Sequence, residues 1–139
     1  MTYLVERLAD LRKHLDHLKA LRPRVNSQAL RADLSLHNDV LFSLLMVCQL
    51  VIDVAGELSA ERGMAFEDYT QAVRNLAALK LVSHGTLAEL ERLPGFRNIL
   101  VHEYVALDMD RVVEAINRLD PIEEFSQRLQ RLLTERSEG

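Results

Sequence analysis

One long helix, apolar over much of its surface, constrains the fold of this chain most. From Gln28 to about Arg62 there is no proline, and apolar residues recur at helical spacing. We expect a single helix here, about 50 Å long. Its inward positions are predicted to be Leu30, Leu34, Leu41, Leu44, Leu45, Cys48, Val51, Ile52, Ala55 and Leu58. The apolar arc is wide from Val40 onward, so this helix is predicted to lie at the centre of the fold.

The segments before and after this helix also have helical patterns. Thr2 to Leu21 carries a narrow leucine seam, which could form a coiled-coil edge, but its length of fewer than three heptads favours packing in a bundle. The leucines of the seam are Leu4, Leu8, Leu11, Leu15 and Leu18. Ser27 is the expected N-cap of the central helix. Glu67 to about Leu81 is predicted to be a third helix, followed by a turn at 83–86 and a short helix from Leu87 to Leu93.

The C-terminal part begins with a capping residue and contains a proline. Asp108 is the expected N-cap of the last helix, with Asp110 in its first turn. Pro121 interrupts the apolar pattern that follows. Either the helix kinks there, or Asp120 and Pro121 start a new helix as N-cap and N1.

Composition supports an all-α chain with one domain. In 139 residues there are only five glycines and three prolines, and 48% of residues are hydrophobic. We predict an antiparallel up-and-down helical bundle of four to five helices, a single domain over residues 1–139. Cys48 stands alone in an apolar run and is predicted to be a small buried hydrophobic residue.

Apolar runs and charge limit the expected location and partners. The longest apolar run, Val40 to Ile52, is interrupted by Ser43 and Gln49 and is shorter than a membrane span. The N-terminus does not resemble a signal peptide, so we expect a cytoplasmic protein without a membrane partner. The net charge of −4 counts mildly against a nucleic-acid binder, which is usually basic.

The chemistry-bearing residues of the chain gather between 97 and 104. If residues 96–105 are helical, the spacing of about 100° per residue aligns Asn98 with His102 and Arg97 with Tyr104. The apolar residues Phe96, Ile99 and Leu100 then fall on the other side of the helix. The segment is therefore predicted to dock its apolar side on the bundle and to expose a polar side.

Histidine and arginine together are sufficient for one reaction on RNA. The histidine takes the 2′-hydroxyl proton, the oxygen attacks the adjacent phosphate, and the arginine stabilises the negative charge that develops. Structural roles are the more common ones at this spacing. Arg97 would then pair with Asp53 or Glu103, His102 would be half-buried and hydrogen-bonded, and Tyr104 would lie at a rim.

The same helical spacing favours a dimer. Arg97 and His102 diverge by about 140° around the helix axis. That angle is too wide for both side chains to hold one phosphate, unless Arg97 reaches across to a second chain. Contacts related by a two-fold axis are the commonest kind between identical chains. The spacing therefore predicts that Arg97 of one chain meets His102 of another.

The stretch Arg97-Asn98-Ile99-Leu100-Val101-His102-Glu103-Tyr104 resembles the signature of the HEPN superfamily, specifically its HepT-like branch. That signature is an arginine, a polar residue, three further residues, a histidine, any residue and a tyrosine. Residues 50–53, 66–81 and 107–116 are similar to other segments of the branch. The likeness spans roughly residues 35–130.

The resemblance implies a function and a set of partners. It implies a homodimer of helical bundles with metal-independent endoribonuclease activity, no cofactor and RNA as the substrate. Such a chain is the toxin of a toxin–antitoxin module, whose antitoxin is a minimal nucleotidyltransferase. By position, Arg97 and His102 are catalytic and Asn98 supports them. Tyr104 is both a cleft residue and the expected site of AMP addition.

Two points stay open at this stage. Asp53 is a weaker supporting candidate, because a carboxylate inside an apolar helix is costly to bury unpaired and should find a cation such as Arg97. The alternative function is a HEPN-like module that binds RNA, a nucleotide or a nucleotidyltransferase partner without cutting RNA.

Overall fold

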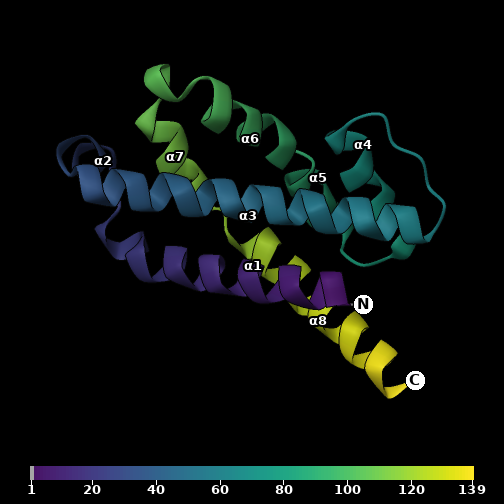
Figure 1. The fold of residues 1–139 in the computed structure, drawn as a ribbon. Helices are drawn as coiled ribbons and strands as arrows, with labels where there is room; N and C mark the ends of the chain where they lie inside the picture. The colour runs from purple at the N-terminus through teal and green to yellow at the C-terminus, as the bar shows by residue number, and fades with distance from the viewer. Residues whose placement is uncertain (1) are drawn as a thin grey trace.

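The computed structural model describes residues 2–139, and this part of the chain contains helices and no strand (Figure 1). The all-α class predicted from the sequence is confirmed. The α-helices are α1 (Thr2–Leu21), α2 (Ser27–Ala32), α3 (Leu34–Glu61), α4 (Tyr69–Arg74), α5 (His84–Leu90), α6 (Leu93–His102), α7 (Met109–Ile116) and α8 (Asp120–Glu138). Short 3₁₀ turns are η1 (Arg22–Arg24), η2 (Asn75–Leu79) and η3 (Tyr104–Ala106).

Helix α3 lies at the centre of the molecule, as its apolar arc predicted. Helix α1 runs antiparallel along one side of it, and α4 and α6 pack on another side (Figure 1). Helix α8 packs against α1 and α5. The leucine seam of α1 is buried throughout, and Cys48 is 1% exposed, so both predictions are confirmed. Burial raises the pKa of the Cys48 thiol to about 12.

The predicted helix from Gln28 to Arg62 is wrong at its start, because the chain breaks at Asp33. This residue has extended backbone angles, and its carboxylate accepts a hydrogen bond from the Leu36 amide at 3.1 Å. An aspartate that caps the following turn competes with helix continuation. Leu34 is consequently the first residue of α3, and it is 72% exposed rather than inward-facing. Asn26, not Ser27, caps α2.

The middle of the chain is also divided more finely than predicted. Helix α4 starts at Tyr69 under the Asp68 cap and tightens into η2 at Asn75. Helix α5 starts at His84, because the Ser83 hydroxyl caps the Thr86 amide. The segment predicted as a turn at 83–86 is therefore the start of a helix.

At the C-terminal end, the restart alternative is confirmed. Asp108 caps α7 as predicted, with its carboxylate accepting from the Asp110 amide at 2.9 Å. Pro121 lies in the first turn of a separate helix, α8, where its missing N–H costs nothing. Leu119 rather than Asp120 occupies the N-cap position.

Helix α3 is also long and apolar enough to span a membrane by length and composition alone. Within the described fold, 56% of its most apolar window is buried against other helices. A central helix of a bundle passes the same test, so packing inside the bundle accounts for the apolar character of α3.

A partly buried ion cluster links α1 to α8. The Glu123 carboxylate pairs with both Arg12 and Lys19, and Arg12 also donates to the Ser126 hydroxyl at 2.8 Å. Burial raises the pKa of Glu123, but the hydrogen bonds and charges of Lys19 and Arg12 outweigh burial and hold that pKa below its ordinary value. The cluster therefore stabilises the packing of the two terminal helices.

Candidate active site on helix α6

Helix α6 carries the polar residues that the sequence singled out. Pro94 lies in its first turn, and Leu100 is buried against the bundle. The helix ends at His102, because Glu103 leaves the helical region with φ −125° and ψ 26°. Tyr104 belongs to η3, where the chain turns toward α7. The prediction of a continuous helix over 96–105 is therefore wrong at its end, and Arg97 and Tyr104 do not share one helical line.

Arg97 is held in place from three directions. Its Nε donates to Gln49 Oε1 on α3 at 3.0 Å, and its Nη1 donates to Asn98 Oδ1 at 3.2 Å. The Arg97 Cζ atom lies 5.9 Å from the centre of the Tyr69 ring on α4, within the range of a cation–π contact. These contacts restrict the guanidinium to one region beside α3.

Asp53 lies in the same network but not directly against Arg97. Gln49 Nε2 donates to Asp53 Oδ1 at 2.8 Å, so the amide bridges the carboxylate and the guanidinium. The nearest cation to Asp53 is Arg7 of α1, at 4.0 Å, and Arg7 in turn lies 4.1 Å from the centre of the Tyr3 ring. The predicted direct pair of Arg97 with Asp53 is therefore wrong. A chain of contacts links Arg97 of α6 to Gln49 and Asp53 of α3, and Asp53 to Arg7 of α1.

Gln49 is the residue that sequence reasoning missed. It lies four residues before Asp53, and this i, i+4 spacing puts both side chains on one face of α3. This spacing alone could have identified Gln49 as a partner of Asp53. It did not name Arg97 as the other partner, which is 48 residues away in the chain.

His102 and Tyr104 lie differently from Arg97. His102 is exposed at the last position of α6, so it is not the half-buried histidine of the structural alternative. Tyr104 is 64% exposed and the neighbouring Val105 is 88% exposed. One chain thus presents an anchored arginine at one end of the polar stretch and an accessible histidine and phenol at the other end.

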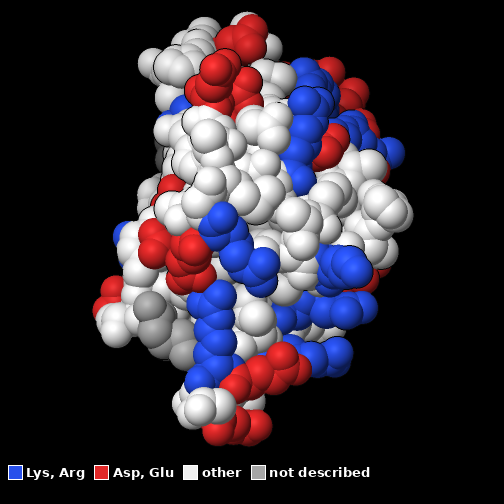
Figure 2. Space-filling view, turned by 90° about the vertical axis from the view of Figure 1, so that its right-hand side faces the viewer, with Lys and Arg blue, Asp and Glu red and all other residues white. Residues whose placement is uncertain are grey.

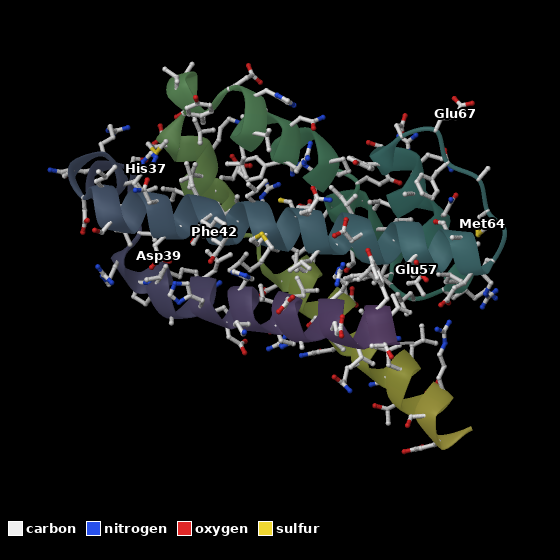
Figure 3. The ribbon with its side chains drawn as sticks, in the orientation of Figure 1. His37, Asp39, Phe42, Glu57, Met64 and Glu67 are labelled. Atoms are coloured by element: carbon white, nitrogen blue, oxygen red, sulfur yellow. The ribbon has the colours of Figure 1, made fainter. Side chains whose placement is uncertain are left out.

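An apolar strip on α3 leads to the arginine network. Phe42 is 58% exposed in the N-terminal third of α3, where Figure 3 labels it. Phe42, Met46, Gln49 and Asp53 follow one another at helical spacing and share one face of the helix. The ring of His14 meets the Phe42 ring edge-on, with 5.8 Å between ring centroids. The polar network therefore borders an exposed aromatic surface.

Comparison with known proteins places this helical chain in a family. The family model of the ribonuclease HepT-like proteins matches residues 11–129. The chain belongs to the ribonuclease HepT-like family. Among the relatives of this HepT-like chain, a protein of Archaeoglobus fulgidus named as a putative RNase is 25% identical over 120 residues, covering 85% of this chain and 91% of the relative. The mRNA nuclease HepT of Shewanella oneidensis is 27% identical over 97 residues, covering 68% of this chain and 73% of the relative.

Solved structures agree with the HepT-like fold. The tri-AMPylated HEPN toxin of Shewanella oneidensis, in complex with its MNT antitoxin, superposes with a TM-score of 0.79 at 21% identity, covering 91% of this chain and 96% of that one. The cytosolic protein YutE of Bacillus subtilis superposes with a TM-score of 0.82 at 14% identity, covering 97% and 91% of the two chains. At these identities the likeness concerns the fold.

The charges on one face of this HepT-like chain are mixed in sign. Figure 2 shows Lys and Arg side chains next to Asp and Glu side chains, with uncharged surface between them. No single-sign patch covers this face. On a surface of this kind, a phosphate depends on individually placed cations rather than on the overall field.

Proposed function

We propose that this protein is a metal-independent endoribonuclease, the toxin of a toxin–antitoxin module. The proposal rests on the different surroundings of two residues of α6, Arg97 and His102. Arg97 is fixed by Gln49 and Asn98, whereas His102 is exposed and accessible to a substrate. Its relatives named as RNase and mRNA nuclease support the same class of reaction.

The proposed reaction needs only these two side chains. Neutral His102 takes the proton of a 2′-hydroxyl, and the oxygen forms a bond to the adjacent phosphorus while the bond from phosphorus to the 5′-oxygen breaks. The leaving 5′-oxygen takes a proton from water, His102 afterwards returns its proton to water, and a 2′,3′-cyclic phosphate remains. Arg97 donates to the phosphoryl oxygens as their negative charge increases. RNA is the expected substrate because DNA lacks the attacking hydroxyl.

A second copy of the chain is proposed to complete the site. Arg97 is tied to α3, whereas His102 lies exposed at the end of α6. A two-fold contact through the apolar strip around Phe42 would bring Arg97 of one protomer toward His102 of its partner. The exposure of this phenylalanine supports such an interface, since large exposed apolar side chains are typical of binding surfaces.

The proposed regulator is a minimal nucleotidyltransferase antitoxin in the same cytoplasm. The Tyr104 phenol is exposed and therefore accessible to another protein's active site. Its oxygen would attack the α-phosphorus of ATP, forming a bond to AMP as pyrophosphate leaves and the phenol proton is lost. The added phosphate brings negative charge next to His102, which would disfavour RNA binding there.

The nuclease is tested with purified protein whose mass shows that Tyr104 carries no AMP. Labelled RNA should be cleaved in EDTA, and DNA of the same sequence should remain intact. His102→Ala and Arg97→Ala should each abolish cleavage, while Arg131→Ala, at an exposed position of α8, serves as the matched control. Cleavage that requires a divalent metal, or that survives both substitutions, would contradict the mechanism.

The second candidate function is a binding module that holds RNA, a nucleotide or a nucleotidyltransferase partner without cutting RNA. The acidic net charge of −4 favours a nucleotide or protein ligand over RNA for such a module, because nucleic-acid binders are usually basic. RNA affinity measured against salt concentration separates the two candidates. Binding with a steep salt slope and no product supports the module, and product formation supports the nuclease.

A further inference from the structure

A groove lies between α6 and α7, on the side of α6 opposite Arg97. Its volume is about 310 Å³. It is lined by Arg92, which directly precedes α6, and by Gly95, Phe96 and Ile99 of α6. On the other side, α7 and the residues after it line it with Arg111, Glu114, Ala115 and Arg118. Both sets repeat at i, i+3, i+4 and i+7, so each helix turns one whole face toward the groove. The volume is at the lower end of the range for small-molecule sites.

The floor of the groove is apolar. It is formed by Leu44, Val47 and Cys48 of α3, Leu90 of α5 and Ile122 of α8, which are all buried. Gly95 opens the wall on the α6 side, since a Cβ atom built on it meets no other atom within 4 Å. Because Gly95 has no side chain, it leaves space at the groove wall that a larger residue at this position would fill.

The rim of the groove carries an excess of positive charge. Arg92 lies 3.5 Å from Glu89 and 3.8 Å from Glu114. Arg118 lies 3.6 Å from each of the same two carboxylates. Over residues 2–139, no carboxylate lies within ion-pair distance of the third arginine, Arg111. Three guanidinium groups therefore face two carboxylates, and Arg111 is the cation left over.

We propose that this groove binds a small amphipathic anion, with its apolar body on the floor and one carboxylate-like head group on Arg111. An apolar cavity with one convergent charge is the usual construction of such a site. A guanidinium holds a carboxylate through two parallel hydrogen bonds, which makes Arg111 suited to the head group. The two sources of this chemistry are a linear acyl chain and a flat aromatic acid.

The test uses octanoate and 1-naphthoate as probes, in calorimetric titrations without RNA. Octanol and octylammonium carry the same chain as octanoate without the negative charge. We expect one anion bound per chain, and binding at least about tenfold tighter than that of octylammonium. If octanoate binds more tightly than 1-naphthoate, the ligand is a linear acyl anion. If 1-naphthoate binds more tightly, the ligand is an aromatic acid.

Matched variants locate the binding. Gly95→Leu fills the groove and should remove binding, and Ala115→Leu does the same from α7 if the first variant fails to fold. Arg111→Gln should weaken the anions by about tenfold and leave octanol unchanged. Arg131→Gln on α8 is the control and should change nothing.

The proposal is overturned if neither anion binds at millimolar concentration, or if octanol and octylammonium bind as well as octanoate. It is also overturned if both groove-filling variants fold, by circular dichroism, and retain wild-type affinity. Because the readout is binding of these probes alone, the result is independent of whether the chain cleaves RNA.

Discussion

Arg97 Nε on α6 donates a hydrogen bond to Gln49 Oε1 on α3 at 3.0 Å. Gln49 uses its amide nitrogen for Asp53, so its orientation is fixed from two sides. The candidate catalytic cation is thus positioned by the central helix rather than by its own helix. This relationship gives Gln49 a role that can be separated from that of Arg97.

Replacing Gln49 with leucine should lower RNA cleavage by about tenfold, because the guanidinium loses the acceptor that aims it. The effect is expected in kcat, whereas KM changes little. Gln127→Leu, at an exposed position of α8, is the control. In an Arg97→Ala background, Gln49→Leu should have no further effect. A further loss there would show that Gln49 acts on something other than Arg97.

Mixing two inactive variants tests whether the site is shared between protomers. Arg97→Ala and His102→Ala chains, unfolded together and refolded, should regain roughly a quarter of wild-type activity, because half of the randomly paired dimers contain one intact shared site out of two. Each variant refolded alone should stay inactive. If the mixture is also inactive, Arg97 and His102 act within one chain.

The apolar strip of Phe42 and Met46 on α3 is predicted to form the dimer contact. Phe42→Glu places a charge in a surface that would otherwise be desolvated, so it should shift the chain toward monomers in light scattering. Cleavage should fall in proportion to the dimer fraction. Val5→Glu, at another exposed apolar residue, is the control. A dimer that persists in Phe42→Glu would place the interface elsewhere.

Tyr104 is predicted to be the site of nucleotide modification. Co-expression with a minimal nucleotidyltransferase should raise the mass of the chain by whole AMP units and suppress its activity. Tyr104→Phe should abolish the mass change while leaving the helical content unaltered, because the phenol is 64% exposed. Tyr3→Phe is the matched control, and a mass change that survives Tyr104→Phe would move the site to another residue.

The Glu123 cluster predicts a stability that depends on pH. Since the pKa of Glu123 in the folded state lies below its ordinary value of 4.5, its contribution is present above pH 4.5 and is lost as pH falls through the folded-state pKa. Urea unfolding at pH 7 and pH 3 should show that the wild-type protein loses more stability between the two pH values than Glu123→Gln does. Equal losses in the two proteins would exclude a role for this carboxylate.

Local sequence signals predicted the helices and some of their ends. Apolar periodicity located α1 and the core of α3, and Asp108 identified the start of α7. Asp33 and Ser83 are also N-caps, of α3 and α5, but the apolar pattern around them did not predict a helix start at either residue. Both residues close a helical turn through a hydrogen bond to an amide three residues ahead. An aspartate or serine can lie inside a helix or cap the start of a new one. Only the backbone geometry shows which of the two roles it has.

The sequence by itself determined the all-α class and the residues of the polar stretch, because helical periodicity and a short motif are local properties of the chain. The tertiary structure alone decided how those residues are held. It placed Gln49 between Arg97 and Asp53, gave Asp53 a partner in Arg7, and ended α6 at His102. These contacts join residues far apart in the chain, so they depend on how the helices pack and not on any spacing within one helix.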